Sequence, residues 1–95
     1  MIRITNITVI PHYQLNCRFN SGEIKTLNVL PIIEHHKHLI GVESLLNEEI
    51  FANVRIGEFG EIYWKNIVKT EYDGQVFIWD YDISPEFAYL NSISC

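Results

Sequence analysis

The histidine-rich segment Glu34-His35-His36-Lys37-His38 is the part of the sequence whose residue types most directly suggest chemistry. If this segment is helical, Glu34 and His38 lie one turn apart and could share a divalent metal ion. A protein metal site, however, needs three or four ligands supported by a second shell of hydrogen bonds. The remaining histidine, His12, is distant in the sequence. We therefore interpret the segment as a solvated helix face and predict neither a bound metal nor another cofactor.

The acidic residues near the end of the sequence are a second candidate for chemistry. Asp80, Asp82 and Glu86 could form a carboxylate pair for acid–base catalysis or hold Mg²⁺. They fit a structural role better, because Asp82 and Ser84 suit a helix entry and Glu86 suits the first turn of that helix. The sequence contains no glycine-rich phosphate loop, nucleophile motif or cysteine pair at zinc spacing. We predict that the chain is not an enzyme.

The acidic charge of the chain is concentrated at this end. Up to Lys69 there are seven acidic and seven basic residues, and beyond Lys69 there are five acidic residues and no basic one, which gives the net charge of −5. Aromatic residues alternate with these acids, and aromatic anchors with clustered charge are typical of protein interfaces. The candidate interaction surface therefore comprises Trp79, Asp80, Tyr81, Asp82, Glu86 and Tyr89. The alternative is that the acids only keep the protein soluble and cap a helix.

The same charge distribution argues against nucleic acid and membrane partners. The aromatic rings could stack on bases, but the phosphates would then meet an acidic surface rather than the basic groove that binding requires. No apolar run approaches the ~18 residues that a membrane-spanning helix needs. The first residues contain no apolar core of a signal peptide, and we expect a cytoplasmic protein.

The first half of the chain is expected to form a strand hairpin followed by short helices. Residues 13–19 alternate between apolar and polar, which predicts a strand of an antiparallel sheet with one wet face. Residues 2–10 precede it as a strand with a bulge near Asn6, and residues 24–30 return after a turn at 20–23. Cys17 falls on the apolar side of its strand, and we interpret it as a reduced core thiol rather than the partner of Cys95.

Helices are expected at three places. Pro31 can open a helix whose apolar stripe runs to Leu39 and Ile40 and which Gly41 ends. Asn47 is suited to cap a very short second helix over 47–51. The run Ser84-Pro85-Glu86 combines a capping hydroxyl, a proline at the first helical position and an acid in the first turn.

The second half of the chain is expected to contain a further hairpin and a buried strand. Residues 52–56 and 62–64 form the hairpin, and 65–72 is either a continuation of the strand or a loop. Asp73-Gly74 is a turn signal before the run Val76-Phe77-Ile78-Trp79, which is apolar on both faces and should therefore lie centrally or be covered by a helix. The side chains expected to be most buried are Phe19, Val54, Ile56, Trp64, Ile78 and Phe87.

Together these elements predict a single α+β domain over residues 1–95. We expect an antiparallel sheet of about five or six strands in hairpins, with two or three short helices packed on it.

Three stretches in this order resemble the small bacterial domain-of-unknown-function family 2442. They are the hairpin Phe19-Asn20-Ser21-Gly22-Glu23, the strands and turn from Phe51 to Trp64, and the closing Asp82-Ile83-Ser84-Pro85-Glu86-Phe87-Ala88-Tyr89. The sequence departs from the family between Trp64 and Asp82, where Lys65 to Tyr81 could add a hairpin arm. The resemblance implies a small α+β fold in a bacterial cytoplasm, without a defined activity or transferable site residues.

The resemblance also bears on partners. Some members of the family carry a helix-turn-helix domain after this one, and others are encoded beside a second small protein, similar to toxin–antitoxin pairs. We therefore expect a protein-interaction or regulatory module that binds a basic, neighbour-encoded protein or self-associates. The alternatives are a nucleic-acid-linked regulator without its own DNA-binding domain and a small enzyme.

Overall fold

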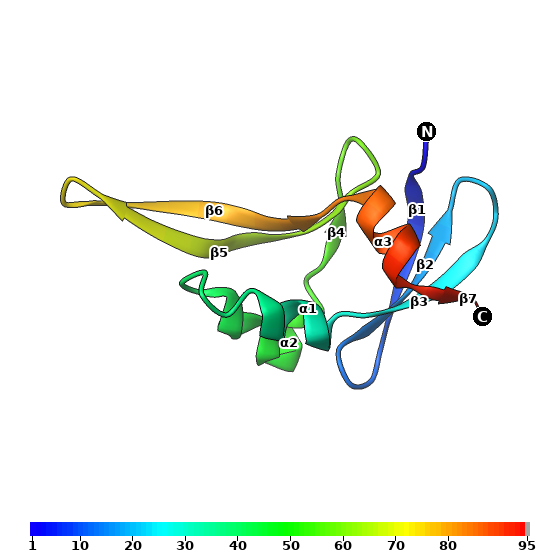
Figure 1. The fold of residues 1–95 in the computed structure, drawn as a ribbon, viewed down its shortest axis with the longest axis horizontal. Helices are drawn as coiled ribbons and strands as arrows, with labels where there is room; N and C mark the ends of the chain where they lie inside the picture. The colour runs from blue at the N-terminus through cyan, green and yellow to red at the C-terminus, as the bar shows by residue number, and fades with distance from the viewer. Residues whose placement is uncertain (95) are drawn as a thin grey trace.

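The computed structural model describes residues 1–94, which form two antiparallel sheets and several short helices (Figure 1). The first sheet has the order β1-β2-β3-β7, with β1 (Ile4–Ile10), β2 (Gln14–Phe19), β3 (Ile24–Asn28) and β7 (Ile93–Ser94). The second has the order β4-β5-β6, with β4 (Arg55–Ile56), β5 (Ile62–Tyr72) and β6 (Gln75–Ile83). The helices are α1 (Leu30–His35), the 3-10 helix η1 (Val42–Leu46), α2 (Glu48–Phe51) and α3 (Pro85–Asn91).

The predicted α+β class and the antiparallel pairing are confirmed. The strands do not form the expected sheet of about five or six, because they are divided between one sheet of four and one of three. None of the helices in residues 1–94 is long and apolar enough to cross a membrane.

The β1–β2–β3 meander follows the predicted pattern closely. The register between β1 and β2 shifts between Ile4 and Asn6, as the change of apolar phase predicted. Leu15, Cys17 and Phe19 are buried on the inner face of β2, each at most 1% exposed. Cys17 is a free thiol whose pKa burial raises to about 11. A disulfide to Cys95 lies outside the described residues.

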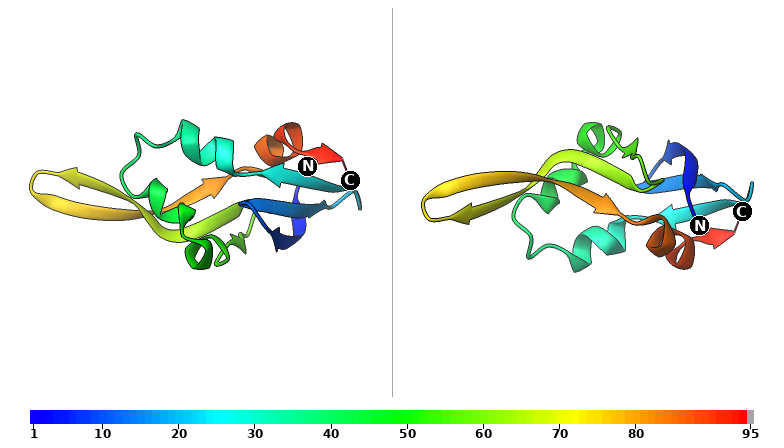
Figure 2. Two further views of the ribbon diagram at one scale, coloured as in Figure 1. Left: turned by 90° about the horizontal axis from the view of Figure 1, so that it is seen from below. Right: turned by 90° about the horizontal axis from the view of Figure 1, so that it is seen from above.

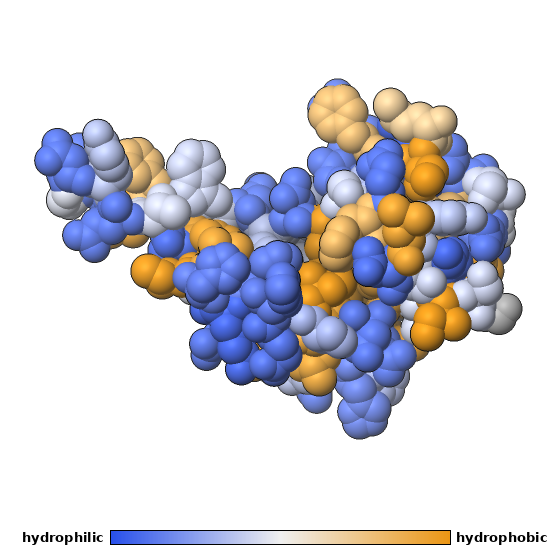
Figure 3. Space-filling model, in the orientation of Figure 1, coloured by the Kyte–Doolittle hydropathy of each residue, from blue (hydrophilic) through white to orange (hydrophobic). Residues whose placement is uncertain are grey.

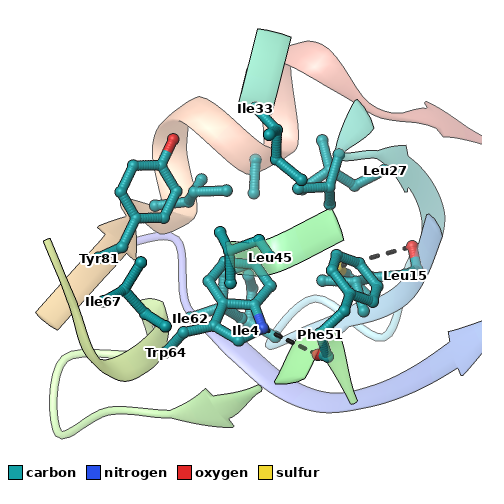
Figure 4. Packing of buried hydrophobic residues seen from close by; sticks show 14 of the residues in the cluster. Ile4, Leu15, Leu27, Ile33, Leu45, Phe51, Ile62, Trp64, Ile67 and Tyr81 are labelled. Carbon is teal, nitrogen blue, oxygen red and sulfur yellow. Dashed lines mark hydrogen bonds between the residues drawn. The ribbon is translucent and has the colours of Figure 1, made fainter. Parts of the chain in front are cut away.

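The core lies where the helices meet the two sheets, and Trp64 of β5 is its largest side chain (Figure 4). The Trp64 Nε1–H group donates to the Phe51 carbonyl oxygen over 2.8 Å, so its polar atom is satisfied within the core. Phe19 and Trp64 are as buried as predicted. Val54 and Ile56 are only partly buried and pack against the core from its edge.

Helices α1, α2 and α3 begin within one residue of the predicted positions, but η1 was not predicted and α1 is shorter than expected. It ends at His35, and turns lead to Gly41, whose φ of 100° no other residue type adopts easily. Ile40 is 67% exposed, so the apolar residues that predicted a longer helix do not all lie on one buried face. Asn47 caps α2 by accepting from the Glu49 and Ile50 amides, and Ser84 caps α3 by accepting from the Phe87 amide. Both cap predictions are confirmed.

The β5–β6 hairpin is the most extended part of the fold and runs well beyond the other elements in every view (Figures 1 and 2). Residues 65–72 continue the strand, and Asp73 and Gly74 form the turn with φ values of 51° and 78°. The hairpin gives the molecule extents of 46 × 27 × 20 Å.

The prediction that Val76-Phe77-Ile78-Trp79 is central or covered by a helix is wrong. β6 is an edge strand, and Ile78 is 53% exposed because the helices cover only the part of the hairpin nearest the first sheet. Phe87, which was also expected in the core, is 43% exposed on α3, where Ala88 takes the buried position.

Candidate functional site

The outer end of the β5–β6 hairpin, residues 68–79, is here called the arm. Its pairing runs from Val68 opposite Trp79 to Tyr72 opposite Gln75. Within the arm, Tyr72 is 77% exposed, Val76 62%, Phe77 41%, Ile78 53% and Trp79 55%. Figure 3 shows the arm projecting from the body, with apolar atoms among hydrophilic ones on the face in view. A continuous run of apolar residues thus faces solvent on both sides of one strand.

One face of the arm is a continuation of the protein core. Because side chains alternate along a strand, Phe77 and Trp79 lie on the same side of β6 as Tyr81 and Ile83. Tyr81 and Ile83 are only 6% and 4% exposed, whereas Phe77 and Trp79 are largely uncovered. The apolar face of β6 therefore extends past the helices that bury its inner half.

The two rings on this face have a defined arrangement. Phe77 and Trp79 are stacked with centroids 6.4 Å apart and an interplanar angle of 30°. The Trp79 Nε1–H group donates to Thr70 Oγ1 over 2.8 Å, across the hairpin. The rings are thus ordered before any partner arrives, which lowers the entropy cost of binding.

The outer edge of β6 carries unpaired backbone groups. The Lys69 amide donates to the Ile40 carbonyl oxygen, so it points away from β6. Lys69 and Ile78 are directly opposite, and in such a pair the backbone groups of both residues point outward. The N–H and C=O groups of Ile78, and by alternation those of Val76, face the outer edge. Among residues 1–94, no strand pairs with that edge.

A hollow of about 470 Å³ lies at the base of the arm. It is lined by four carboxylate residues and one basic residue together with aromatic rings: Gly57, Glu58, Glu61, Tyr63, Lys65, Trp79, Asp80 and Asp82. Hydrogen bonds orient two of the carboxylates. Glu61 Oε1 accepts from the Phe59 amide at 2.9 Å, and Asp80 Oδ1 accepts from the Asn66 amide at 3.0 Å. We call this region the acidic hollow.

The structure brings together only part of the surface that the sequence predicted. Trp79, Asp80 and Asp82 line the acidic hollow. Glu86 is exposed on α3 and does not line it. Tyr89 is half-buried, with its ring edge on Phe19, the Lys25 ammonium 3.9 Å from its ring centre and its hydroxyl donating to Glu23.

Tyr81 was expected on the interaction surface and is instead a core residue, 6% exposed. Burial, together with the nearby Asp82 carboxylate, raises the Tyr81 pKa to about 12. Its hydroxyl lies 2.6 Å from Nδ1 of His36, which comes from the turn after α1. Tyr81 thus ties β6 to the helical segment and is not available to a partner.

The histidine segment is only in part the solvated helix face that was predicted, because α1 ends at His35 and His36 is half-buried against Tyr81. Burial lowers the His36 pKa, and the neighbouring His35 and His38 lower it further. Lys37 and Glu34 form an ion pair at 3.0 Å on the exposed side. Within residues 1–94, no three or more His, Cys, Asp or Glu side chains are grouped as metal ligands would be. That the segment binds no metal stays a prediction.

Glu58, Glu61 and the exposure of the arm were not predicted, although Lys65 to Tyr81 were expected as a possible hairpin arm. The two glutamates lie in the β4–β5 turn, and they reach the hollow because Tyr63 pairs with Asp82 across the second sheet. The signal for the arm was present, since an Asp-Gly turn between two long strand patterns predicts a hairpin that extends beyond its neighbours.

No family model, no curated protein and no solved structure matches this chain. The resemblance to the domain-of-unknown-function family therefore stays a prediction, and the function must be argued from the geometry.

Proposed function

We propose that this chain is a protein-interaction module whose binding surface consists of the arm and the acidic hollow at its base. The observation that carries the proposal is the exposure of Val76, Phe77, Ile78 and Trp79 on both faces of an edge strand whose outer edge pairs with no other strand in residues 1–94. A strand with apolar side chains on both faces is normally covered on both.

The size of the apolar surface supports this function. Aromatic side chains bury about 150–250 Å² each, so the exposed fractions of Tyr72, Phe77 and Trp79 amount to roughly 250–450 Å². The largest apolar patch on a typical monomer is about 300–600 Å² and is often functional. Val76 and Ile78 add further apolar area to that of the rings.

The form of the arm gives a second physical argument. A two-stranded hairpin alone is at best marginally stable in water and gains stability from a third strand or from packing against another surface. Lys69 receives such support through Ile40, but residues beyond it have none from residues 1–94. A protein partner would supply it.

The acidic hollow indicates the chemistry of a partner. Glu58, Glu61, Asp80 and Asp82 line the hollow, and Lys65 is the one basic residue among its lining residues. The Arg3 guanidinium lies beside the hollow and donates to the Glu58 carbonyl oxygen. Clustered charge of one sign steers an oppositely charged protein and makes association faster at low salt. We infer that the partner is a basic protein, encoded beside this one in a bacterial genome and bound in the cytoplasm.

The other two candidate functions have weaker support. The stacked Phe77 and Trp79 rings could receive nucleic acid bases, but the carboxylates beside Trp79 would repel the phosphates. A regulator linked to nucleic acid would then act through a protein partner. An enzyme would need a nucleophile or acid–base pair placed against a substrate, and we propose no catalytic role for the hollow.

The test is the binding of the neighbour-encoded protein at about 25 mM and about 150 mM salt, where the screening lengths differ about twofold. We expect Asp80→Asn with Asp82→Asn to slow association and to reduce its salt dependence. The carboxamide that replaces the Asp80 carboxylate still offers an oxygen to the Asn66 amide, so the arm stays in place.

Glu86→Gln is the matched control for Asp80→Asn alone, since each removes one negative charge and only Asp80 lines the hollow. Phe77→Ser should weaken binding at both salt concentrations, because the contact that it removes is apolar. Binding that none of these changes alters, in variants that remain folded by circular dichroism, would refute the arm and hollow as the binding surface.

A further inference from the structure

We propose that the outer edge of β6 pairs with the same edge of a second copy of this chain, so that two arms join into one antiparallel sheet in the order β5-β6-β6′-β5′. This inference rests on the proposed interaction function of the arm and names the molecule that covers its edge. The dimer would then present both acidic hollows and both pairs of aromatic rings to other partners.

The backbone of the edge is suited to this pairing. The N–H and C=O groups of Val76 and Ile78 point outward, away from β5, as derived from the hydrogen bond between Lys69 and Ile40. Exposed strand edges of this kind pair with other strands unless charge, proline or a bulge protects them. Residues 75–79 contain no charged residue and no proline, and the register shift in β5 lies further in, between Trp64 and Val68.

The side chains of the edge complement themselves. An antiparallel pairing about Phe77 places Val76 opposite Ile78′ on one face and Phe77 opposite Phe77′ on the other. A pairing about Ile78 places Phe77 opposite Trp79′ and Ile78 opposite Ile78′. Next to the two-fold axis both alignments set apolar residues against apolar residues, and such cross-strand pairs are the stabilising unit of a sheet. The outermost pairs are mixed, with Gln75 opposite Trp79′ in the first alignment and Val76 opposite Asp80′ in the second.

The pairing also explains why the sequence of β6 is typical of a central strand. Val76, Phe77, Ile78 and Trp79 are apolar on both faces, a pattern that belongs to strands buried on both faces, which commonly lie centrally in a sheet. Within one chain β6 has a neighbour on one side only. A second copy supplies the missing neighbour.

The area predicts a reversible dimer rather than an obligate one. Edge pairing covers at most the ring surface beside that edge, and Tyr72 lies on β5, away from it. The exposed fractions of Phe77 and Trp79 amount to roughly 300–500 Å² over two arms. A specific interface normally buries at least about 1,000 Å² in total, so this one lies below that limit even with Val76 and Ile78 included. We expect a dissociation constant in the micromolar range.

Charge gives the dimer a signature that differs from that of a basic partner. Each copy carries a net charge of −5, so two copies repel one another. Salt screens this repulsion and should strengthen the dimer between about 25 and 150 mM, whereas it weakens the binding of a basic protein. The sign of the salt effect therefore identifies the partner.

The first test is sedimentation equilibrium of the purified chain from low micromolar to several hundred micromolar protein. We expect a monomer–dimer equilibrium that shifts toward dimer at about 150 mM salt. Ile78→Lys should raise the dimer dissociation constant at least about tenfold, because it sets a charge among the apolar cross-strand pairs and a like charge opposite itself where position 78 faces 78′. The matched control is Ile93→Lys, which alters an exposed isoleucine on the edge strand of the other sheet and should leave the equilibrium unchanged.

The second test locates the contact by disulfide formation in a Cys95→Ser background, where the remaining thiol, Cys17, is buried. Phe77→Cys or Ile78→Cys should form an intermolecular disulfide under mild oxidation, since residues facing each other across the two-fold axis are about 4.5–5.5 Å apart. Glu71→Cys is the control, because β5 and β5′ are separated by about 14 Å in the joined sheet.

The outcomes separate the two proposals. A chain that stays monomeric at every concentration and salt, or that dimerises equally well with Ile78→Lys, overturns the pairing of two copies. If the same monomer still binds the neighbour-encoded protein and Phe77→Ser abolishes that binding, the proposed interaction function stands. If Ile78→Lys does not alter the dimer and Phe77→Ser does not alter binding of the neighbour-encoded protein, both proposals fail.

Discussion

At the scale of single residues, the two tryptophans of this chain differ mainly in what covers them. Trp64 is 1% exposed, its ring lies 5.5 Å from that of Phe51, and its Nε1–H group has a carbonyl partner in the core. Trp79 is 55% exposed and is held only by Thr70 and Phe77 within the arm. Sequence pattern alone made both candidates for burial, but only Trp64 contributes to the core.

Replacing each tryptophan with alanine should therefore lower the stability of the protein by very different amounts. We expect Trp64→Ala to lower the free energy of unfolding by about 3–5 kcal/mol, since it creates a large cavity and removes a satisfied hydrogen bond. Trp79→Ala should cost less than about 1 kcal/mol, as expected for an exposed position. Urea denaturation followed by circular dichroism measures both changes. An equal loss of unfolding free energy in the two variants would contradict the division between core and arm.

At the scale of elements, the arm is anchored to the body where the turn after α1 meets β5. Ile40 accepts the Lys69 amide, and the next residue, Gly41, lies against the backbone of Ile67. A Cβ atom at Gly41 would lie 2.0 Å from the Ile67 carbonyl oxygen. The chain can pass this point only because glycine has no side chain and adopts a φ of 100°.

Gly41→Ala should therefore destabilise the protein more than the same change at another glycine with positive φ. Gly22 is the matched control, because its φ is 91° and nothing lies within 4 Å of a Cβ atom built there. The left-handed backbone costs about 1–2 kcal/mol at either position, and the clash with Ile67 adds to it at Gly41 alone. Thermal or urea unfolding measures the difference. Similar stability of both variants would show that the turn after α1 does not hold the arm as described.

The local structure of most elements could be predicted from the sequence, because each depended on neighbouring residues. The alternation over 13–19, the Asn47 and Ser84 caps and the Asp73-Gly74 turn all act within a few residues of the chain. The burial of β6 could not be predicted in this way. Periodicity shows that Val76 to Trp79 require cover on both faces, but it does not tell whether the same chain or another molecule provides it.

The candidate site was predicted in part for a similar reason. Asp80 and Asp82 stood out because they follow each other closely in the sequence. Glu58 and Glu61 belong to a different turn, and only the register that sets Tyr63 against Asp82 brings the two groups together. Tyr81 was placed on the surface because its neighbours are acidic, but alternation along β6 turns it toward the core.

At the scale of the whole molecule, the chain consists of a body with a buried core and an arm that carries apolar side chains away from it (Figure 2). The body encloses the buried core, and no buried side-chain polar atom described in it lacks a partner, although Phe59 and Leu90 are exposed on it. The arm has an unpaired edge and uncovered faces. This contrast is the reason to assign binding to the arm and stability to the body.

The most direct measurement of the central claim is residue-resolved amide hydrogen exchange along β6. In an uncovered arm, the Val76 and Ile78 amides point outward and exchange fast, whereas the Phe77 and Trp79 amides bond to β5 and exchange more slowly. We predict that the Val76 and Ile78 amides exchange more slowly as the protein concentration rises or when the basic partner is added. Ile78→Lys should remove the dependence of the Val76 exchange rate on protein concentration. Fast exchange at Val76 and Ile78 under all these conditions would contradict the claim that the arm is a binding surface.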